Sequence, residues 1–112
     1  MHDNTNKYVA CLQQTLAKYD GGLTAVLKRI PTSEGVKNNA LADGVAPSGT
    51  RLWRTNFAAL GPAFRAYRDK DCADLGIAAA GYGMGGMEER LACQINETSR
   101  EIDRLKDRYD LK

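Results

Sequence analysis

Residues 87–109 read MEERLACQINETSREIDRLKDRY, and this stretch decides the fold class. Its apolar positions recur at steps of four and three, which is the spacing of one face of an α-helix. Charged residues fill the opposite face, where Glu97 precedes Glu101 by four positions and Arg104 precedes Arg108 by four. The stretch therefore predicts a long amphipathic helix that turns one stripe toward a core. The stripe consists of Met87, Leu91, Ile95, Thr98, Ile102, Leu105 and Tyr109.

A similar stripe begins near the amino terminus and predicts a first helix. It keeps its phase across Gly21 and Gly22, so we expect one helix, with these glycines as the place where a bend would occur. Asp3 or Thr5 could cap its start. The stripe consists of Val9, Leu12, Leu16, Tyr19, Leu23, Leu27 and Ile30.

The middle of the chain carries a third stripe, formed by Trp53, Phe57, Leu60, Phe64 and Tyr67. These side chains are expected to lie in the core. A nearby Ser48 or Thr50 is a suitable N-cap. The proline at position 62 removes a backbone donor, which predicts a kink near residues 60–61.

Breaker residues separate the three helical stretches. Residues 31–49 hold several glycines and prolines, which predict a loop. A short helix over residues 33–41 is an alternative for part of it. Residues 75–86 are rich in alanine and glycine and predict a flexible connection. No strand-like alternation competes with these patterns. The chain is therefore expected to be all-α, a small antiparallel bundle of three main helices in one domain over 1–112, with residues 1–6 as a disordered remnant.

Composition limits the function. The chain has 112 residues, 43% of them hydrophobic, which suits one domain with a modest core. Sixteen Lys and Arg against fourteen Asp and Glu give a net charge of +2. This balance argues against binding nucleic acid or a membrane surface by bulk electrostatics. No apolar run is long enough to span a membrane, and no signal segment is visible. Residues 1–6 read like a start residue placed before a processed sequence.

Catalytic and metal-binding patterns are weak. The single histidine is His2, at the terminus, and none of the three cysteines forms a Cys-x-x-Cys pair, so neither a zinc site nor a nucleophile–histidine arrangement is expected. The glycines of residues 81–86 lack the Lys-Ser/Thr ending of a phosphate-binding loop. We expect no cofactor and no enzymatic activity. The acidic residues on either side of this loop have charged neighbours, which is typical of solvated surface rather than of a catalytic site. They are Asp69, Asp71, Asp74, Glu88 and Glu89.

Two cysteines lie on either side of the glycine-rich connection. Cys72 is expected to end the second helix, and Cys93 lies in the first turns of the third. Antiparallel packing would bring these helix ends together, as a disulfide requires. Spacing alone does not decide between a disulfide and two buried thiols.

The stretch from Phe64 to Cys72 reads FRAYRDKDC, and it is followed by a Gly-Gly pair and then by a second cysteine. This arrangement resembles the LprI-type lysozyme-inhibitor family. The first helix is also similar, through Cys11, Asp20 and Leu23. Phe64 stands where that family usually carries Trp. The residues that carry the resemblance are Phe64, Tyr67, Arg68, Asp69, Cys72, Gly85, Gly86 and Cys93, together with Thr98.

The resemblance implies a periplasmic or secreted domain in which Cys72 and Cys93 are paired. Cys11 is then left over, and three alternatives stay open: a partner lost through truncation, a free thiol that is buried, or a link between two chains. The implied function is to bind and inhibit a lysozyme or a related cell-wall hydrolase. The alternative is a structural, interaction or immunity module of the cell envelope without such a target, acting through a helical face or a Cys11-linked homodimer.

Within the first of these hypotheses, the loop between the two cysteines would meet the enzyme. Tyr82 would be its aromatic anchor, with Met84 beside it, and the acidic residues flanking the loop would meet a cationic partner. Arg68 could instead serve the fold, by pairing with a carboxylate or with carbonyls at a helix end. A direct partner contact by Arg68 stays open.

Overall fold

The computed structural model describes residues 2–32, 47–79 and 85–111, and side chains within 7–31, 53–74 and 86–111. It contains four α-helices in the order α1 (His2–Arg29), α3 (Pro47–Ala58), α4 (Leu60–Ala79) and α5 (Gly85–Arg108), and the short 3₁₀ helix η1 (Ile30–Thr32). The described ranges contain no strand. The prediction of an all-α fold is confirmed.

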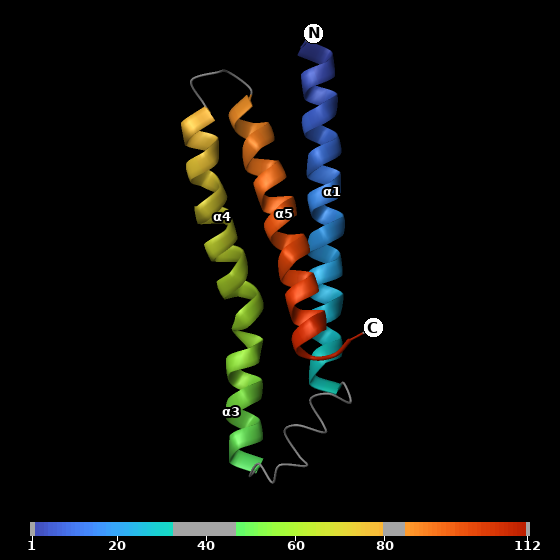
Figure 1. The fold of residues 1–112 in the computed structure, drawn as a ribbon, viewed down its shortest axis with the longest axis vertical. Helices are drawn as coiled ribbons and strands as arrows, with labels where there is room; N and C mark the ends of the chain where they lie inside the picture. The colour runs from blue at the N-terminus through green and yellow to red at the C-terminus, as the bar shows by residue number, and fades with distance from the viewer. Residues whose placement is uncertain (1, 33–46, 80–84, 112) are drawn as a thin grey trace.

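The helices form three rods, because α3 and α4 follow one another along the same side of the molecule (Figure 1). The rod of α3 and α4 runs opposite to both α1 and α5. α5 lies between α1 and α4 and packs against both. The principal extents of 61 × 24 × 16 Å describe an elongated, thin bundle. The core is therefore a narrow seam along α5 rather than a sphere.

The largest part of the core lies where α1 and α5 end and α3 meets α4. Its buried members are Leu23, Val26, Ile30, Phe57 and Leu105. Aromatic rings close this end of the seam: Trp53 stacks on Phe57 with ring centroids 5.0 Å apart, and Tyr109 meets both rings edge-on. The expectation that Trp53, Phe57 and Phe64 serve the core agrees with this packing, since Phe57 is buried and the other two pack against it.

The predicted kink lies at Ala59, between α3 and α4. Pro62 has no amide to donate, and around the break Ala59 N–H bonds to Asn56 O at 3.2 Å and Ala63 N–H to Ala59 O at 3.1 Å. The kink also lets α4 approach α1 closely. A Cβ on Gly61 would lie 3.0 Å from Leu27 Cδ1, so glycine fits this crossing better than a larger residue.

The residues of α4 that face the core differ from one prediction. Tyr67 was expected to point inward, but its side chain is 64% exposed. Beyond the break the buried positions are Gly61, Arg68 and Cys72. The buried face keeps its helical spacing from Phe57 through Gly61 to Arg68, so it continues in phase across the break. Arg68, and not the apolar Tyr67 beside it, takes the inward position because it finds polar partners on α1 and α5.

Several boundaries and faces also differ from expectation. α1 begins at His2, so residues 2–6 are helical rather than a disordered remnant, and it is continuous through both glycines. α4 does not end at Cys72 but continues to Ala79, and α5 starts with the glycine pair that was placed in the loop. Met87 and Tyr19 are exposed, and Glu101, placed on the charged face, is buried. The short helix considered for 33–41 lies outside the described residues.

No helix in the described part of the chain combines the length and apolar character needed to cross a membrane.

Candidate functional site

A disulfide joins α4 to α5 through Cys72 and Cys93, whose Cα atoms are 5.6 Å apart. This separation lies in the usual range for a disulfide, and the Cys72 side chain is fully buried. The predicted pairing is confirmed, and the alternative of two buried thiols is wrong. Cys11 is free and exposed on α1, so a buried thiol is wrong for this position too.

Arg68 connects all three rods from a buried position next to the disulfide. It is only 4% exposed. Its Nη1 donates to Asp20 Oδ1 of α1 at 2.6 Å and to Thr98 Oγ1 of α5 at 3.0 Å, and its Nε donates to Asp69 Oδ1 of α4 at 2.8 Å. Burial disfavours the charge, but the hydrogen bonds and the negative charges of Asp69 and Asp20 outweigh it and raise the pKa of Arg68.

The partners of Arg68 are held in turn by their own contacts. Thr98 donates to Gln94 O at 2.7 Å, and the Gln94 side chain donates to Asp69 Oδ1 at 3.0 Å. Arg65 donates to Thr24 Oγ1 at 2.7 Å and pairs with Asp20 at 3.6 Å. Each buried polar group in this network therefore has a partner, and no buried side-chain nitrogen or oxygen in the described residues lacks one.

The network settles the two alternatives for Arg68. Its pairing with carboxylates is confirmed, and its burial leaves no surface for a direct partner contact. It also brings together residues that the resemblance singled out in three separate stretches. Asp20, Arg68, Asp69 and Thr98 meet at one junction, although up to 78 positions separate them in the chain (98 minus 20). Phe64 packs beside this junction, with the guanidinium carbon of Arg68 5.9 Å from its ring centroid.

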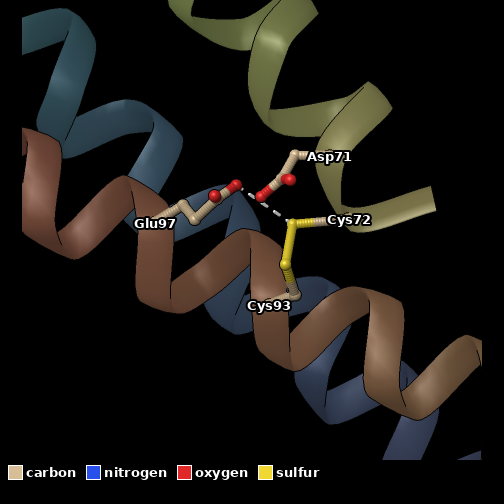
Figure 2. A group of neighbouring side chains, drawn as sticks. All are labelled: Asp71, Cys72, Cys93 and Glu97. Atoms are coloured by element: carbon tan, nitrogen blue, oxygen red, sulfur yellow. Dashed lines mark hydrogen bonds between the residues drawn. A yellow bond between two sulfur atoms is a disulfide. The ribbon is translucent and has the colours of Figure 1, made fainter. Parts of the chain in front are cut away.

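Two carboxyl groups lie next to the disulfide. Figure 2 shows Asp71 and Glu97 pointing toward one another from α4 and α5, and Glu97 Oε2 lies 3.2 Å from Cys72 Sγ. Partial burial raises the pKa of Glu97 to about 7, assisted by its hydrogen bond with Asp71 and the charge of that carboxylate, while Arg100 and Arg68 oppose the shift.

The contact between Asp71 and Glu97 was not predicted from the sequence. Glu97 was assigned to the charged outer face of the last helix, with Glu101. A usable signal was present, because Glu97 follows Cys93 by four residues and Asp71 precedes Cys72 directly. Residues four apart lie on the same face of a helix, so Glu97 could be placed next to the bonded Cys93.

Three of the predicted acidic residues lie from the middle of α4 onward and two lie at the start of α5; α4 ends and α5 begins near the start of α1 (Figure 1). Four of the five are exposed and Glu88 is half-buried. Lys70 and Arg90 are the basic residues among them, so negative charge prevails locally although the whole chain is slightly basic. Tyr82 and Met84 lie outside the described residues. The acidic residues are Asp69, Asp71, Asp74, Glu88 and Glu89.

No protein-family model matches this chain, and neither a curated protein nor a solved structure is significantly similar to it. The resemblance to LprI-type inhibitors therefore rests on the residues quoted above.

Proposed function

We propose that this chain is an exported binding protein that inhibits a lysozyme or a related cell-wall hydrolase, in the manner of the LprI-type family that it resembles. One observation carries the proposal. Several residues of the resemblance meet at a single junction, in which Arg68 joins Asp20, Asp69 and Thr98 near the Cys72–Cys93 bond. A chance similarity of short stretches would not require these residues to contact one another.

The junction supports the proposal because it fixes the end of the bundle that carries the acidic residues. The disulfide ties α4 to α5 near that end, and Arg68 ties both helices to α1. Fixing a binding surface before the encounter lowers the entropy lost on association. Lysozymes are cationic enzymes with acidic clefts, and the local excess of carboxylates would attract the cationic surface around the cleft.

The same proposal includes an oxidising compartment and no catalytic activity. Structural disulfides persist in secreted and periplasmic proteins, and this bond with its buried Cys72 sulfur is compatible with such a location. Glu97, next to Asp71, is the one carboxyl group among the described residues whose pKa is strongly raised. We assign Asp71 and Glu97 a structural role in the contact between α4 and α5 rather than a role in acid–base catalysis, because they lie against the disulfide.

The proposal is tested by calorimetric binding to chicken-type, goose-type and invertebrate-type lysozymes. A charge-reversal variant, Asp74→Lys/Glu89→Lys, changes two exposed residues at the acidic end. A matched control, Asp103→Lys/Asp107→Lys, makes the same change in net charge near the other end of α5, also at exposed positions. We expect the first variant to weaken binding by about tenfold or more and the control to leave it nearly unchanged. Equal losses in the two variants would contradict the assignment of the surface.

A second candidate is supported by Cys11. The structure leaves this thiol exposed on the same face of α1 as Thr15 and Tyr19, which line a groove between α1 and α5. A disulfide between two Cys11 side chains would link two chains along this face, as an envelope interaction module. Electrophoresis without reductant distinguishes this candidate: a dimer that disappears in Cys11→Ser favours it, and a monomer contradicts it.

A further inference from the structure

Four potential metal ligands meet where α4 crosses α5. They are the carboxylates of Asp71 and Glu97 and the sulfurs of Cys72 and Cys93, and their ligand atoms all lie within 4.8 Å of one another. Each helix contributes one carboxylate and one sulfur, from adjacent residues in α4 and from residues four apart in α5. Figure 2 shows both carboxyl groups directed toward the disulfide side of the crossing.

The disulfide itself prevents metal binding, because zinc is held by thiolates and not by oxidised sulfur. Reduction removes that obstacle. The S–S bond breaks, the reductant supplies two electrons, two protons are taken up, and two thiols result. Zinc then displaces both thiol protons. Thiolate sulfur and carboxylate oxygen are both established zinc ligands, and the soft sulfurs favour zinc over magnesium or calcium.

We propose that the reduced chain binds one Zn²⁺ ion through Asp71, Cys72, Cys93 and Glu97. Zinc and the disulfide are then alternative crosslinks between α4 and α5, selected by the redox state of the two cysteines. This inference does not depend on lysozyme binding. It assigns a second role to the two cysteines at the crossing and a function to the two carboxyl groups beside them.

The distances at the crossing agree with such a site. In a tetrahedral zinc site with Zn–S of about 2.3 Å and Zn–O of about 2.1 Å, sulfur and oxygen ligands are about 3.6 Å apart. Glu97 Oε2 and Cys72 Sγ are already 3.2 Å apart. The two sulfurs must separate to about 3.8 Å once their bond is broken, which side-chain rotation can supply. The Cα separation of 5.6 Å between the cysteines need not increase greatly for this.

The site is tested in the Cys11→Ser background, so that the third thiol does not bind the ion. A water-soluble phosphine reduces the bond: its phosphorus takes the oxygen of one water to become the phosphine oxide, and two thiols form. Zn²⁺ affinity is measured by competition with a chromophoric chelator. Co²⁺ serves as a spectroscopic substitute, because thiolate ligation gives charge-transfer absorption and tetrahedral ligation gives intense d–d bands.

We expect the reduced chain to bind one equivalent and the oxidised chain to bind none at the same concentrations. Glu97→Gln should weaken Zn²⁺ binding by at least about tenfold, since even the loss of groups that only support ligands has effects of this size. Asp74→Asn is the matched control: it removes an exposed carboxylate of α4 outside the cluster and should leave the affinity unchanged.

Two results would overturn the proposal. One is equal affinity in Glu97→Gln and Asp74→Asn, which would mean that the cysteines bind the ion without the carboxylates. The other is a reduced chain that binds zinc no better than Cys72→Ser/Cys93→Ser. If reduction unfolds the chain, zinc binding at this site must restore its helices, and circular dichroism measures that gain. In that unfolded case, zinc binding without any gain in helicity would also contradict the proposed site.

Discussion

The replacement of Arg68 by Met tests how the bundle is held together at its centre. Methionine fills much of the same volume and keeps the apolar contacts of the stem, but it removes the charge and every donor. The substitution breaks the hydrogen bonds from Arg68 to Asp20 and Thr98, which join α4 to the other two rods, and the bond to Asp69 within α4. Its effect therefore measures the junction rather than a loss of packing.

The size of the effect follows from the exposure of the partners. Loss of one member of a fully buried ion pair costs about 3–5 kcal/mol, because the other charge stays buried and unpaired. Here the side chains of Asp20 and Asp69 are 31% and 52% exposed, so water can hydrate both once Arg68 is gone. Thr98 keeps its bond to Gln94 O. We therefore expect Arg68→Met to lower the free energy of unfolding by about 2–3 kcal/mol.

The assay is urea unfolding of the oxidised protein at neutral pH, followed by helical circular dichroism. Arg68→Lys should lie between wild type and Arg68→Met, because lysine keeps the charge without the planar donor geometry. Arg90→Met is the control, since Arg90 is exposed on α5 and its loss should change stability by less than about 0.5 kcal/mol. If Arg68→Met were no more destabilising than Arg90→Met, the junction would not hold the three rods together.

Three further predictions concern stability. The folded state holds the Glu97 proton more tightly than the unfolded chain, with a pKa of about 7 against 4.5. The stability that this proton contributes is therefore fully present below pH 4.5 and is lost as the pH rises to about 7. Since Glu97 is partly hydrated, we expect this loss to be about 1–2 kcal/mol and absent in Glu97→Gln; unfolding curves with the same pH slope in both proteins would refute it. Cys72→Ser/Cys93→Ser should destabilise the chain by about 3 kcal/mol in the chain-entropy account, and an unchanged melting temperature would rule out a stabilising crosslink. Gly21→Ala should stabilise α1 by about 0.5–1 kcal/mol because its Cβ meets nothing, whereas Gly61→Val should destabilise by about 1–3 kcal/mol through the close crossing; thermal melts that rank these two variants in the opposite order would contradict the packing.

The parts of the fold that could be predicted from sequence are those that depend on one helix at a time. The stripe from Leu91 to Leu105 kept its phase and lies in the seam. Pro62 gave the position of the kink, because its effect on the backbone is local. The disulfide could be predicted only with the aid of the resemblance, since the spacing of Cys72 and Cys93 left two alternatives.

The parts that could not be predicted depend on how one helix sits against another. Apolar character wrongly placed Tyr67 in the core, whereas the neighbouring Arg68 takes the inward position because groups on α1 and α5 accept its hydrogen bonds. Arg68 can be buried because Asp20 and Thr98 accept its hydrogen bonds from other helices, and no sequence pattern within α4 indicates these partners. Asp71 and Glu97 could be placed together only by way of the Cys72–Cys93 bond, which the spacing of the cysteines alone left undecided.

The proposal that this chain inhibits a cell-wall hydrolase is tested most directly by titrating the muramidase activity of a matched lysozyme with the purified, oxidised protein. The measurement is the rate of peptidoglycan hydrolysis at increasing molar ratios of the chain to the enzyme. The proposal predicts that activity falls to near zero for at least one lysozyme type, and that Asp74→Lys/Glu89→Lys needs about tenfold more protein for the same inhibition. Full activity of every type at micromolar excess of the chain would contradict it.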